Sequence, residues 1–368
     1  MNILQIREKL DRGGIEVLLY DICKNAKKSG LNIYLSTFSK GELDEEFNVL
    51  DCTMIELKRK YPIDIKLVKN LRRIVIERDI DVIHTHQAIE ALHAYLATWG
   101  LKRKVKNIIS HHGSIYPMKD KFVMKFLIPR VSQNLAVSNS YLKRLEKEEN
   151  FRISKNFQVL YNGIDQKKIN LNGTDIKDEL SLSKSTRLLG MVGNFYNTGR
   201  DQFTICQALV PLYKLYNDIH FIFIGGWEKG KSDSYYQCIE FCKRENIQGR
   251  VHFLGVRQDI GNILRQLDIF VYSSNHDTFG IAVVEAMLAG KPIVVNDIPA
   301  MLEITKDGEV AEIFNSKNHN SLYNSICKLL DNKEYSTKLA VKSKKWATDN
   351  FTIESHLKKL QKIYSDIS

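Results

Sequence analysis

Short apolar runs alternate along this chain with segments in which apolar residues recur every three or four positions. The first two runs, MNILQI at 1–6 and LNIYLSTF at 31–38, flank the helix-like segment GGIEVLLYDICKNAKKSG at 13–30. Apolar runs rich in β-branched and aromatic residues predict buried strands, and the periodic segments predict amphipathic helices. Their order predicts βαβ units, and therefore an α/β fold of parallel sheets with helices on both faces.

The alternation of strand-like and helix-like segments occurs in two stretches, which one polar segment separates. It predicts one doubly wound, Rossmann-like domain at 1–168 and a second at 187–350, because the polar segment 169–186 between them has no strand signal and reads as a linker. Ligands of open parallel sheets bind at the carboxyl ends of the strands, so we expect the two domains to face each other across a ligand-binding cleft.

The end of the chain predicts one further helix. Four apolar residues recur there at helical spacing, namely Ile353, Leu357, Leu360 and Ile363. An amphipathic helix needs a partner for its apolar side. We therefore expect 351–368 to form a helix that packs back on the N-terminal domain.

Composition and charge narrow the class of protein. The chain has 368 residues, of which 43% are hydrophobic, and a formal net charge of +11; these values are typical of a folded protein with more than one domain. Segment 57–130 holds sixteen Lys or Arg residues against six Asp or Glu. Such a basic surface suits nucleic acid, anionic lipid or a phosphorylated substrate, or is only a solvated face.

The chain offers no targeting or metal-binding pattern. We find no apolar core of a signal peptide at the N-terminus and no run near the roughly 20 apolar residues of a membrane span, so we expect a cytoplasmic protein. The six cysteines lack the paired spacing of a metal site. We therefore expect the cysteines to be buried free thiols and not zinc ligands or disulfides.

The segment SSNHDTFGIAVVEAMLAGKPIVVND at 273–297 carries the clearest candidate chemistry. A strand ends just before it, Thr278-Phe279-Gly280 forms a turn, and a short helix follows that ends at Gly290. Unpaired amides and the helix dipole at such a turn favour an anion such as a phosphate. With Asp277 before the turn and Glu285 within the helix, the pattern predicts a ligand with a central phosphate and hydroxyl groups at both ends.

Several motifs in order resemble one known family. They are GGIE at 13–16, SHHG at 110–113, LAVSNS at 135–140, LYNGID at 160–165, VGNF at 192–195 with GRD at 199–201, FLGV at 253–256, and HDTFGIAVVEAMLAGKPIVV at 276–295. In this order and spacing the chain resembles the retaining glycosyltransferases of family 4, the group 1 type, which have the GT-B fold. The resemblance spans nearly the whole chain and implies transfer of a sugar from a nucleotide sugar to a glycan or lipid-linked acceptor, in cell-surface polysaccharide biosynthesis.

The resemblance also implies residue roles in the second domain. Glu285 would accept hydrogen bonds from the ribose hydroxyls, and Asp277 would face the hydroxyls of the donor sugar. Other residues would hold the nucleotide, with the amides of Phe279, Gly280 and Ile281 on the diphosphate and Val256 and Arg257 beside the base. A UDP-sugar is the expected donor, as a substrate, and no cofactor is expected.

Three positions depart from the family pattern. The first acid of its E-x7-E motif is here Asp277, one methylene shorter, and Asn194 stands where the family often has arginine. Arg200 takes the place of the later lysine and would stabilise charge on the departing diphosphate. No divalent metal is then required, and retention would follow from attack on the leaving-group face. A catalytically inactive GT-B protein that binds a nucleotide or a protein partner is the alternative.

The first domain would supply the acceptor side. The resemblance implies that His112 lines the cleft near the anomeric carbon, although the neighbouring His111 is an alternative, and that Gly14 lets a helix N-terminus approach the diphosphate. We expect His84 and His86 to be packing residues.

The basic surface leaves two partners to consider. The segment KDKFVMKFLIPR at 119–130 is either a packed helix with a basic edge or an interfacial helix that meets anionic lipid at the inner face of the cell membrane. Because no aromatic-rich recognition motif accompanies the basic residues, we expect no nucleic-acid partner.

Overall fold

The computed structural model describes residues 1–11, 13–113, 116–171, 173–197, 199–228 and 233–367. Its contacts divide the chain into unit 1, which comprises Met1–Ile164 and Phe351–Ser368, and unit 2, which comprises Asp165–Asn350. Each unit contains one parallel sheet with helices on both faces, as the alternation of apolar runs predicted.

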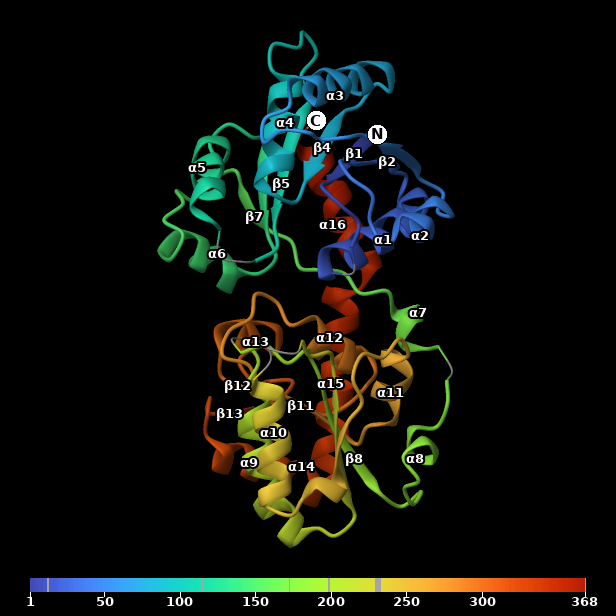
Figure 1. The fold of residues 1–368 in the computed structure, drawn as a ribbon, viewed down its shortest axis with the longest axis vertical. Helices are drawn as coiled ribbons and strands as arrows, with labels where there is room; N and C mark the ends of the chain where they lie inside the picture. The colour runs from blue at the N-terminus through green and yellow to red at the C-terminus, as the bar shows by residue number, and fades with distance from the viewer. Residues whose placement is uncertain (12, 114–115, 172, 198, 229–232, 368) are drawn as a thin grey trace. The chain divides into compact units, whose positions relative to one another are not determined.

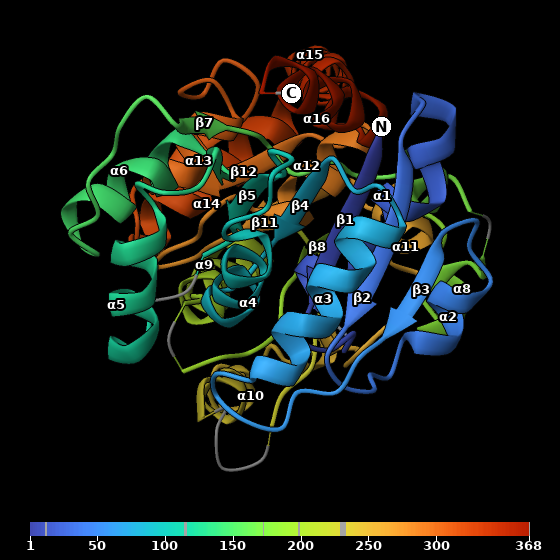
Figure 2. The same cartoon turned by 90° about the horizontal axis from the view of Figure 1, so that it is seen from above.

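In the described part of unit 1 the sheet has seven strands in the order β3-β2-β1-β4-β5-β6-β7, all parallel. The strands are β1 (Asn2–Arg7), β2 (Asn32–Thr37), β3 (Thr53–Glu56), β4 (Val82–Thr85), β5 (Lys106–His111), β6 (Gln133–Ala136) and β7 (Phe157–Val159). The neighbouring arrows of β1, β2 and β3 can be followed in Figure 2. The central strands β1 and β4 are short and buried along almost their whole length, and their apolar residues face helices on both sides of the sheet.

The helices of unit 1 cover both faces of this sheet. They are α1 (Gly14–Ala26), α2 (Asp44–Asn48), α3 (Ile65–Glu77), α4 (Ala88–Thr98), α5 (Met118–Leu127), α6 (Asn139–Lys147) and α16 (Ile353–Asp366), with a short 3-10 turn at Lys27–Ser29. Apolar residues of α3 and α4 pack on one face of β1 and β4. On the other face, α1 and the C-terminal helix α16 enclose the core together, and Figure 1 shows the red α16 beside the blue α1.

Helix α16 completes the core of unit 1. All four apolar residues of the predicted amphipathic pattern are buried in that core, together with Tyr364. A parallel bridge between Ile164 and Thr352 joins the two chain segments of the unit.

In the described part of unit 2 the sheet has six parallel strands in the order β10-β9-β8-β11-β12-β13. The strands are β8 (Arg187–Val192), β9 (Ile219–Ile224), β10 (Val251–Phe253), β11 (Ile269–Tyr272), β12 (Ile293–Asn296) and β13 (Glu312–Phe314). The helices are α7 (Gln166–Ile169), α8 (Ile176–Glu179), α9 (Gln202–Leu215), α10 (Asp233–Arg244), α11 (Ile260–Gln266), α12 (Ile281–Leu288), α13 (Pro299–Ile304), α14 (His319–Asp331) and α15 (Lys333–Phe351), with a 3-10 turn at Gln248–Arg250.

The segment 169–186, expected as a linker, belongs by its contacts to unit 2. Ile176 of α8 is 1% exposed, and its amide donates to the side chain of Gln266 over 2.8 Å. The amide nitrogen of the Asn262 side chain donates to the carbonyl oxygen of Thr174, also over 2.8 Å. These contacts tie the polar segment to α11, so the boundary between the units lies at residue 165 instead.

Candidate functional site

The two loops that carry Arg200 and Asp277 are joined at the carboxyl ends of the adjacent strands β8 and β11. Arg200 and Ser274 form an antiparallel bridge. On either side of it, the amide of Asp201 donates to the carbonyl of Ser273 over 3.1 Å, and the amide of Asn275 donates to the carbonyl of Gly199 over 2.6 Å. This pairing fixes the place from which the Arg200 side chain projects.

Arg200 and Asp277 form an ion pair next to Tyr272. Arg200 Nη1 lies 3.0 Å from Asp277 Oδ2, and the hydroxyl of Tyr272 donates to the same oxygen over 2.6 Å. Burial alone would lower the pKa of Arg200, but Tyr272 and Asp277 raise it above its usual value. The Nε of Arg200 is buried without a hydrogen-bond acceptor. The guanidinium is thus a permanent positive charge at this edge of the sheet.

The other oxygen of Asp277 lies against the turn that precedes α12. Asp277 Oδ1 accepts hydrogen bonds from the amides of Thr278 over 2.8 Å and Phe279 over 3.4 Å. Together with Arg200 and Tyr272, these donors fill about the four acceptor positions that a carboxylate has. Asp277, predicted to face a sugar, therefore already occupies an anion-binding position between Arg200 and the turn.

Gly280 is the N-cap of α12 and has a left-handed backbone, with φ of +92°. A Cβ at this position would lie 2.5 Å from Met301 Cε and 3.3 Å from Ile304 Cδ1. Glycine is required here by the turn and by packing against α13, in addition to any close approach of a ligand. The turn brings the amides at the start of α12, including that of Ile281, to the carboxyl edge of the sheet.

Glu285 lies in the second turn of α12, with its side chain half-buried. The structure therefore places Asp277, the start of α12 and Glu285 on consecutive parts of one loop and helix, as the sequence pattern implied, and Arg200 pairs with Asp277 from the neighbouring loop. Their roles toward a ligand stay predictions.

Asn194 and Val256 meet around Gly226, beyond the ends of β8, β9 and β10. Asn194 Oδ1 accepts from the amide of Gly226 over 2.8 Å, and a Cβ on Gly226 would lie 2.9 Å from Val256 Cγ2. Val256 is 73% exposed. Trp227, which follows Gly226, stacks on Tyr235 with ring centroids 4.0 Å apart. Sequence reasoning missed Trp227, although a tryptophan directly after a Gly-Gly strand end was a usable signal.

Arg257 is engaged in two ion pairs. Its Nη1 lies 2.5 Å from Glu179 Oε1, and its Nε lies 2.9 Å from Asp259 Oδ1. These carboxylates raise the pKa of Arg257. While these ion pairs are closed, a contact with the nucleobase would have to come from the Arg257 backbone or from Val256. The contact stays a prediction.

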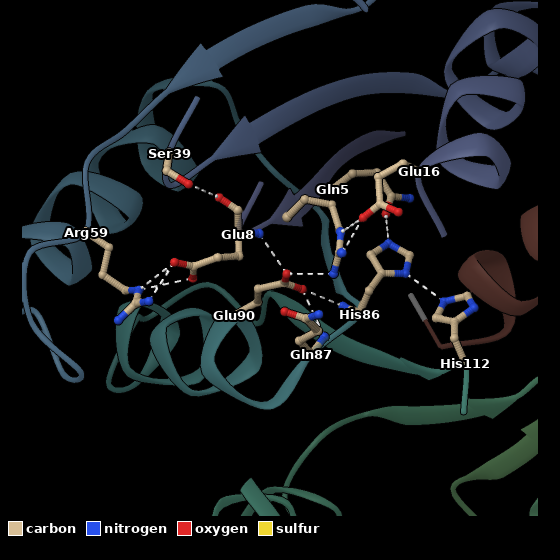
Figure 3. Close-up of polar contacts among 10 residues, drawn as sticks. Gln5, Glu8, Glu16, Ser39, Arg59, His86, Gln87, Glu90 and His112 are labelled. Atoms are coloured by element: carbon tan, nitrogen blue, oxygen red, sulfur yellow. Dashed lines mark hydrogen bonds and ion pairs between the residues drawn. The ribbon is translucent and has the colours of Figure 1, made fainter. Parts of the chain in front are cut away.

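In unit 1, His112 follows β5 and hydrogen-bonds to His86, which follows the adjacent β4. His86 Nδ1 lies 2.9 Å from His112 Nε2, and His86 Nε2 lies 3.0 Å from Gln5 Oε1. Figure 3 shows the His86 ring between Gln5 and His112. Burial, followed by the neighbouring histidines, lowers the pKa of both rings well below the usual value. His86, expected to be a packing residue, thus contacts the candidate acceptor-side residue directly.

The neighbouring His111 lies in the core instead. Its ring nitrogens lie 2.9 Å from the hydroxyl of Tyr116 and 3.1 Å from Asn134 Oδ1, and its ring stacks on Phe157. Burial lowers the pKa of His111 to about 4. Of the two adjacent histidines, only His112 is bonded to His86 among the contacts that the structure describes.

Gly14 begins α1, close to a buried ion triad. Arg7 Nη1 lies 3.0 Å from Glu90 Oε1, and the Arg7 guanidinium also bonds to Glu16 in the first turn of α1. A Cβ on Gly13 would lie 2.5 Å from Glu16 Oε2. Gly13 therefore makes room for the Glu16 carboxylate, whose charge Arg7 balances. A diphosphate contact at Gly14 stays a prediction.

The residues that the structure describes show neither a metal-binding cluster nor a membrane-spanning helix. No group of three or more His, Cys, Asp or Glu side chains among them is placed to hold a metal ion. None of the helices that the structure describes is both long and apolar enough to span a membrane.

Comparisons with known proteins agree with the fold. The model of "Glycosyltransferase Family 4" matches residues 12–168, and that of "Glycosyl transferases group 1" matches residues 173–346. In structure, the chain is similar to Anabaena HepE in complex with UDP-glucose, with a TM-score of 0.82, 18% identity and 100% of both chains covered.

Two relatives of known name are similar to this chain at low sequence identity. The chain is 23% identical over 313 residues to N-acetyl-alpha-D-glucosaminyl L-malate synthase of Bacillus anthracis, covering 83% of this chain and 80% of the relative. It is 22% identical over 323 residues to UDP-Gal:alpha-D-GlcNAc-diphosphoundecaprenol alpha-1,3-galactosyltransferase of Escherichia coli, with the same two shares covered, 83% and 80%. Two matching family models, one over each unit, and two parallel Rossmann-like sheets lead to one conclusion: the chain belongs to the group 1 glycosyltransferases of family 4, which have the GT-B fold.

Proposed function

We propose that this glycosyltransferase is a retaining enzyme that moves a sugar from a UDP-sugar to a glycan or lipid-linked acceptor in cell-surface polysaccharide biosynthesis. The observation that carries the proposal is the start of α12, where the turn at Gly280 and the guanidinium of Arg200 surround a carboxylate. A helix N-terminus and a cation together favour an anion. The diphosphate of a nucleotide sugar is such an anion, and the UDP-glucose complex of HepE and the name of the Escherichia coli relative support this choice.

The donor would replace the internal partners of this site. Its diphosphate would accept hydrogen bonds from the amides of Phe279, Gly280 and Ile281. Asp277 would then turn from the amides of Thr278 and Phe279, which it now contacts, toward the donor sugar. Glu285, on the same helix, would accept from both ribose hydroxyls, since one carboxylate offers several acceptor positions.

The transfer step requires positive charge at the leaving group. The bond from the anomeric carbon to the diphosphate oxygen breaks, and a bond to the acceptor oxygen forms on the same face. The proton of the acceptor hydroxyl passes to the departing diphosphate, so that UDP leaves with it. Because Arg200 is a permanent cation here, it would stabilise the charge that develops in the transition state. We propose that no divalent metal and no further cofactor are needed.

The acceptor would bind to unit 1, with His112 beside the reacting hydroxyl. The exposed side of α5 supports a membrane-anchored acceptor. Met118 is 71% exposed and Phe122 is 67% exposed, and the exposed lysines at 119 and 125 lie on the same helix. Exposed apolar and basic side chains on one helix suit the surface of an anionic membrane. We propose that the protein acts at the inner face of the cell membrane.

Calorimetry against UDP-, GDP- and ADP-sugars, followed by transfer assays with and without EDTA, tests this proposal. We expect a UDP-sugar to bind, Glu285→Ala to weaken donor binding by about tenfold or more, which corresponds to about 1.4 kcal/mol, and Arg200→Ala mainly to lower kcat. Exposed residues of unit 2 provide matched controls, Glu240→Ala and Arg244→Ala.

Three outcomes would count against parts of the proposal. Variants of Glu285 and Arg200 that behave like their controls would refute the site assignment. Loss of transfer in EDTA, restored by Mg²⁺, would refute metal independence. Binding of a nucleotide without transfer or hydrolysis across the donor panel would indicate the alternative, an inactive protein with the same fold.

A further inference from the structure

A chain of buried polar side chains in unit 1 connects His112 to the C-terminal helix. Gln5 on β1, His84 on β4 and Ser110 on β5 lie on the face of the sheet that α1 and α16 cover, where their neighbours are apolar. All three are buried, with exposures of 0%, 2% and 6%. Polar groups in such a place are costly unless they are hydrogen-bonded. Three buried polar residues on adjacent strands therefore indicate a hydrogen-bond network.

Tyr364 of α16 closes one end of this network. Its hydroxyl lies 2.7 Å from His84 Nδ1, and His84 Nε2 lies 2.7 Å from Ser110 Oγ. The Gln5 amide nitrogen donates to the Tyr364 hydroxyl over 3.2 Å, while Gln5 Oε1 lies 3.0 Å from His86 Nε2. The network therefore runs from Tyr364 through Gln5 and His86 to His112.

The donors and acceptors along this path can be assigned in order. The rings of His86 and His112 are neutral at pH 7 because burial holds their pKa values well below the usual one. Since the Gln5 amide nitrogen donates to Tyr364, its oxygen is left to accept the proton on His86 Nε2. A neutral His86 that carries its proton on Nε2 can only accept at Nδ1. His112 must then donate from Nε2, which makes its Nδ1 an acceptor.

The backbone of His86 is held as firmly as its ring. Glu90 Oε2 accepts from the amides of His86 over 2.8 Å and Gln87 over 2.9 Å. Glu90 Oε1 accepts from Arg7 and from the amide of Glu8. Figure 3 shows Glu90, Gln87 and His86 together in this arrangement. Neither the ring nor the main chain of His86 can turn without breaking buried hydrogen bonds.

We propose that Gln5, His86 and Tyr364 are positioning residues that hold His112 in the neutral form protonated at Nε2, so that its Nδ1 can only accept a hydrogen bond. Any group that reaches Nδ1, a hydroxyl group of the acceptor substrate included, would then have to donate the hydrogen bond. Gln5 fixes the proton of His86 on Nε2, and His86 in turn fixes the proton of His112 on Nε2. In each ring, the partner of one nitrogen decides whether the other nitrogen donates or accepts. The inference rests on the proposed function for its consequence in catalysis, but its structural content can be measured on the resting protein.

The direct test is the protonation state of His112 in the full-length protein with ¹⁵N-labelled histidine, assigned by comparison with His112→Gln. We expect a neutral ring at pH 7.5, protonated at Nε2. A ring protonated at Nδ1, or a charged ring, would overturn the proposal. This measurement needs no substrate, so it stands apart from any failure of the proposed function.

Two variants then test the path. Tyr364→Phe removes one hydroxyl and keeps the ring, and we expect a mixture of the two neutral forms of His112 together with an about tenfold lower kcat. The matched control is Tyr213→Phe, another buried tyrosine, whose hydroxyl donates to the Arg250 carbonyl over 2.9 Å in unit 2. If Tyr364→Phe and the control leave both the His112 signal and kcat unchanged, the path has no effect on His112.

His86 offers a rescue experiment. His86→Leu removes the acceptor that His112 Nε2 uses, whereas the side-chain oxygen of His86→Asn can take the place of Nδ1. We expect His86→Leu to lower kcat with unchanged UDP affinity, and His86→Asn to recover most of it. Equal losses in both variants, with the donor still bound, would mean that His86 acts only through packing. If His86→Leu fails to fold, the Tyr364→Phe result and the wild-type spectrum still decide.

Discussion

Gly280→Ala should destabilise unit 2 by about 2 to 3 kcal/mol. An alanine in a left-handed backbone costs about 1 to 2 kcal/mol, and Gly280 has φ of +92°. Overpacking of a filled core costs about 1 to 3 kcal/mol, and the new Cβ would lie 2.5 Å from Met301 Cε, which is itself buried. Because that atom is the end of a flexible side chain that can move aside, the packing cost should fall at the lower end of its range.

Two glycines of the same unit separate these contributions. Gly290 also has a left-handed backbone, with φ of +74°, but its nearest contact would be Lys344 Cδ at 3.4 Å, which is ordinary van der Waals distance. Gly290→Ala should therefore show only the backbone cost of about 1 to 2 kcal/mol. Gly249 has nothing within 4 Å of a new Cβ and no left-handed φ, so Gly249→Ala should change stability by less than about 0.5 kcal/mol.

Tryptophan fluorescence can follow the unfolding of unit 2 alone. The chain has three tryptophans, and Trp99, 70% exposed, is the one in unit 1. In a Trp99→Phe background the urea transition reports on Trp227 and Trp346, both in unit 2. If Gly280→Ala is no less stable than Gly290→Ala, the contact with Met301 does not constrain the turn. If both resemble Gly249→Ala, the conformational argument for the start of α12 is refuted.

Two further predictions concern unit 1. Burial lowers the pKa of His84 to about 3 and those of His111 and His356 to about 4, so the unfolded chain takes up protons first as pH falls below about 6.5, and the three together should cost about 4 kcal/mol of stability between pH 7.5 and pH 5.5. Equal urea midpoints of unit 1 at the two pH values would contradict this. Phe122→Ser should weaken binding to phosphatidylglycerol vesicles about tenfold through lost apolar burial, whereas Tyr236→Ser, at an exposed tyrosine of unit 2, should not; equal binding of both variants in a flotation assay would argue against α5 as the membrane contact.

Much of the fold, and the turn before α12, could be predicted because their signals are local. Strands that are buried on both faces appear as apolar runs, and the turn at Gly280 is marked by its own sequence between such a run and a short helix. Helix α15 (Lys333–Phe351) was missed because its apolar residues do not form a clear stripe among its many lysines. The segment 169–186 was predicted to be a linker because it is polar. A single buried residue, Ile176, and two side-chain hydrogen bonds are nevertheless enough to attach it to unit 2.

The histidine network could not be predicted from neighbouring residues in the sequence. Gln5 and Tyr364 are 359 positions apart, and their contact requires the strand order β1-β4-β5 and the return of α16 to unit 1. A weaker signal was nevertheless present. Gln5 interrupts the apolar run of β1, and His84 and Ser110 directly follow the apolar pairs of β4 and β5. Buried polar residues on three adjacent strands of one sheet have to be satisfied by one another or by a covering helix.

The return of α16 has a consequence for biosynthesis on the ribosome. Unit 1 begins at the N-terminus, yet part of its core, including Leu357, Leu360 and Tyr364, is translated last. The ribosome must add the whole of unit 2 first, residues 165–350, which takes about 10 to 40 s at translation rates of about 5 to 20 residues per second. During that time the face of the nascent sheet beneath α16 is uncovered. Chains stalled before residue 351 should therefore have a protease-sensitive unit 1 and present their apolar face to chaperones.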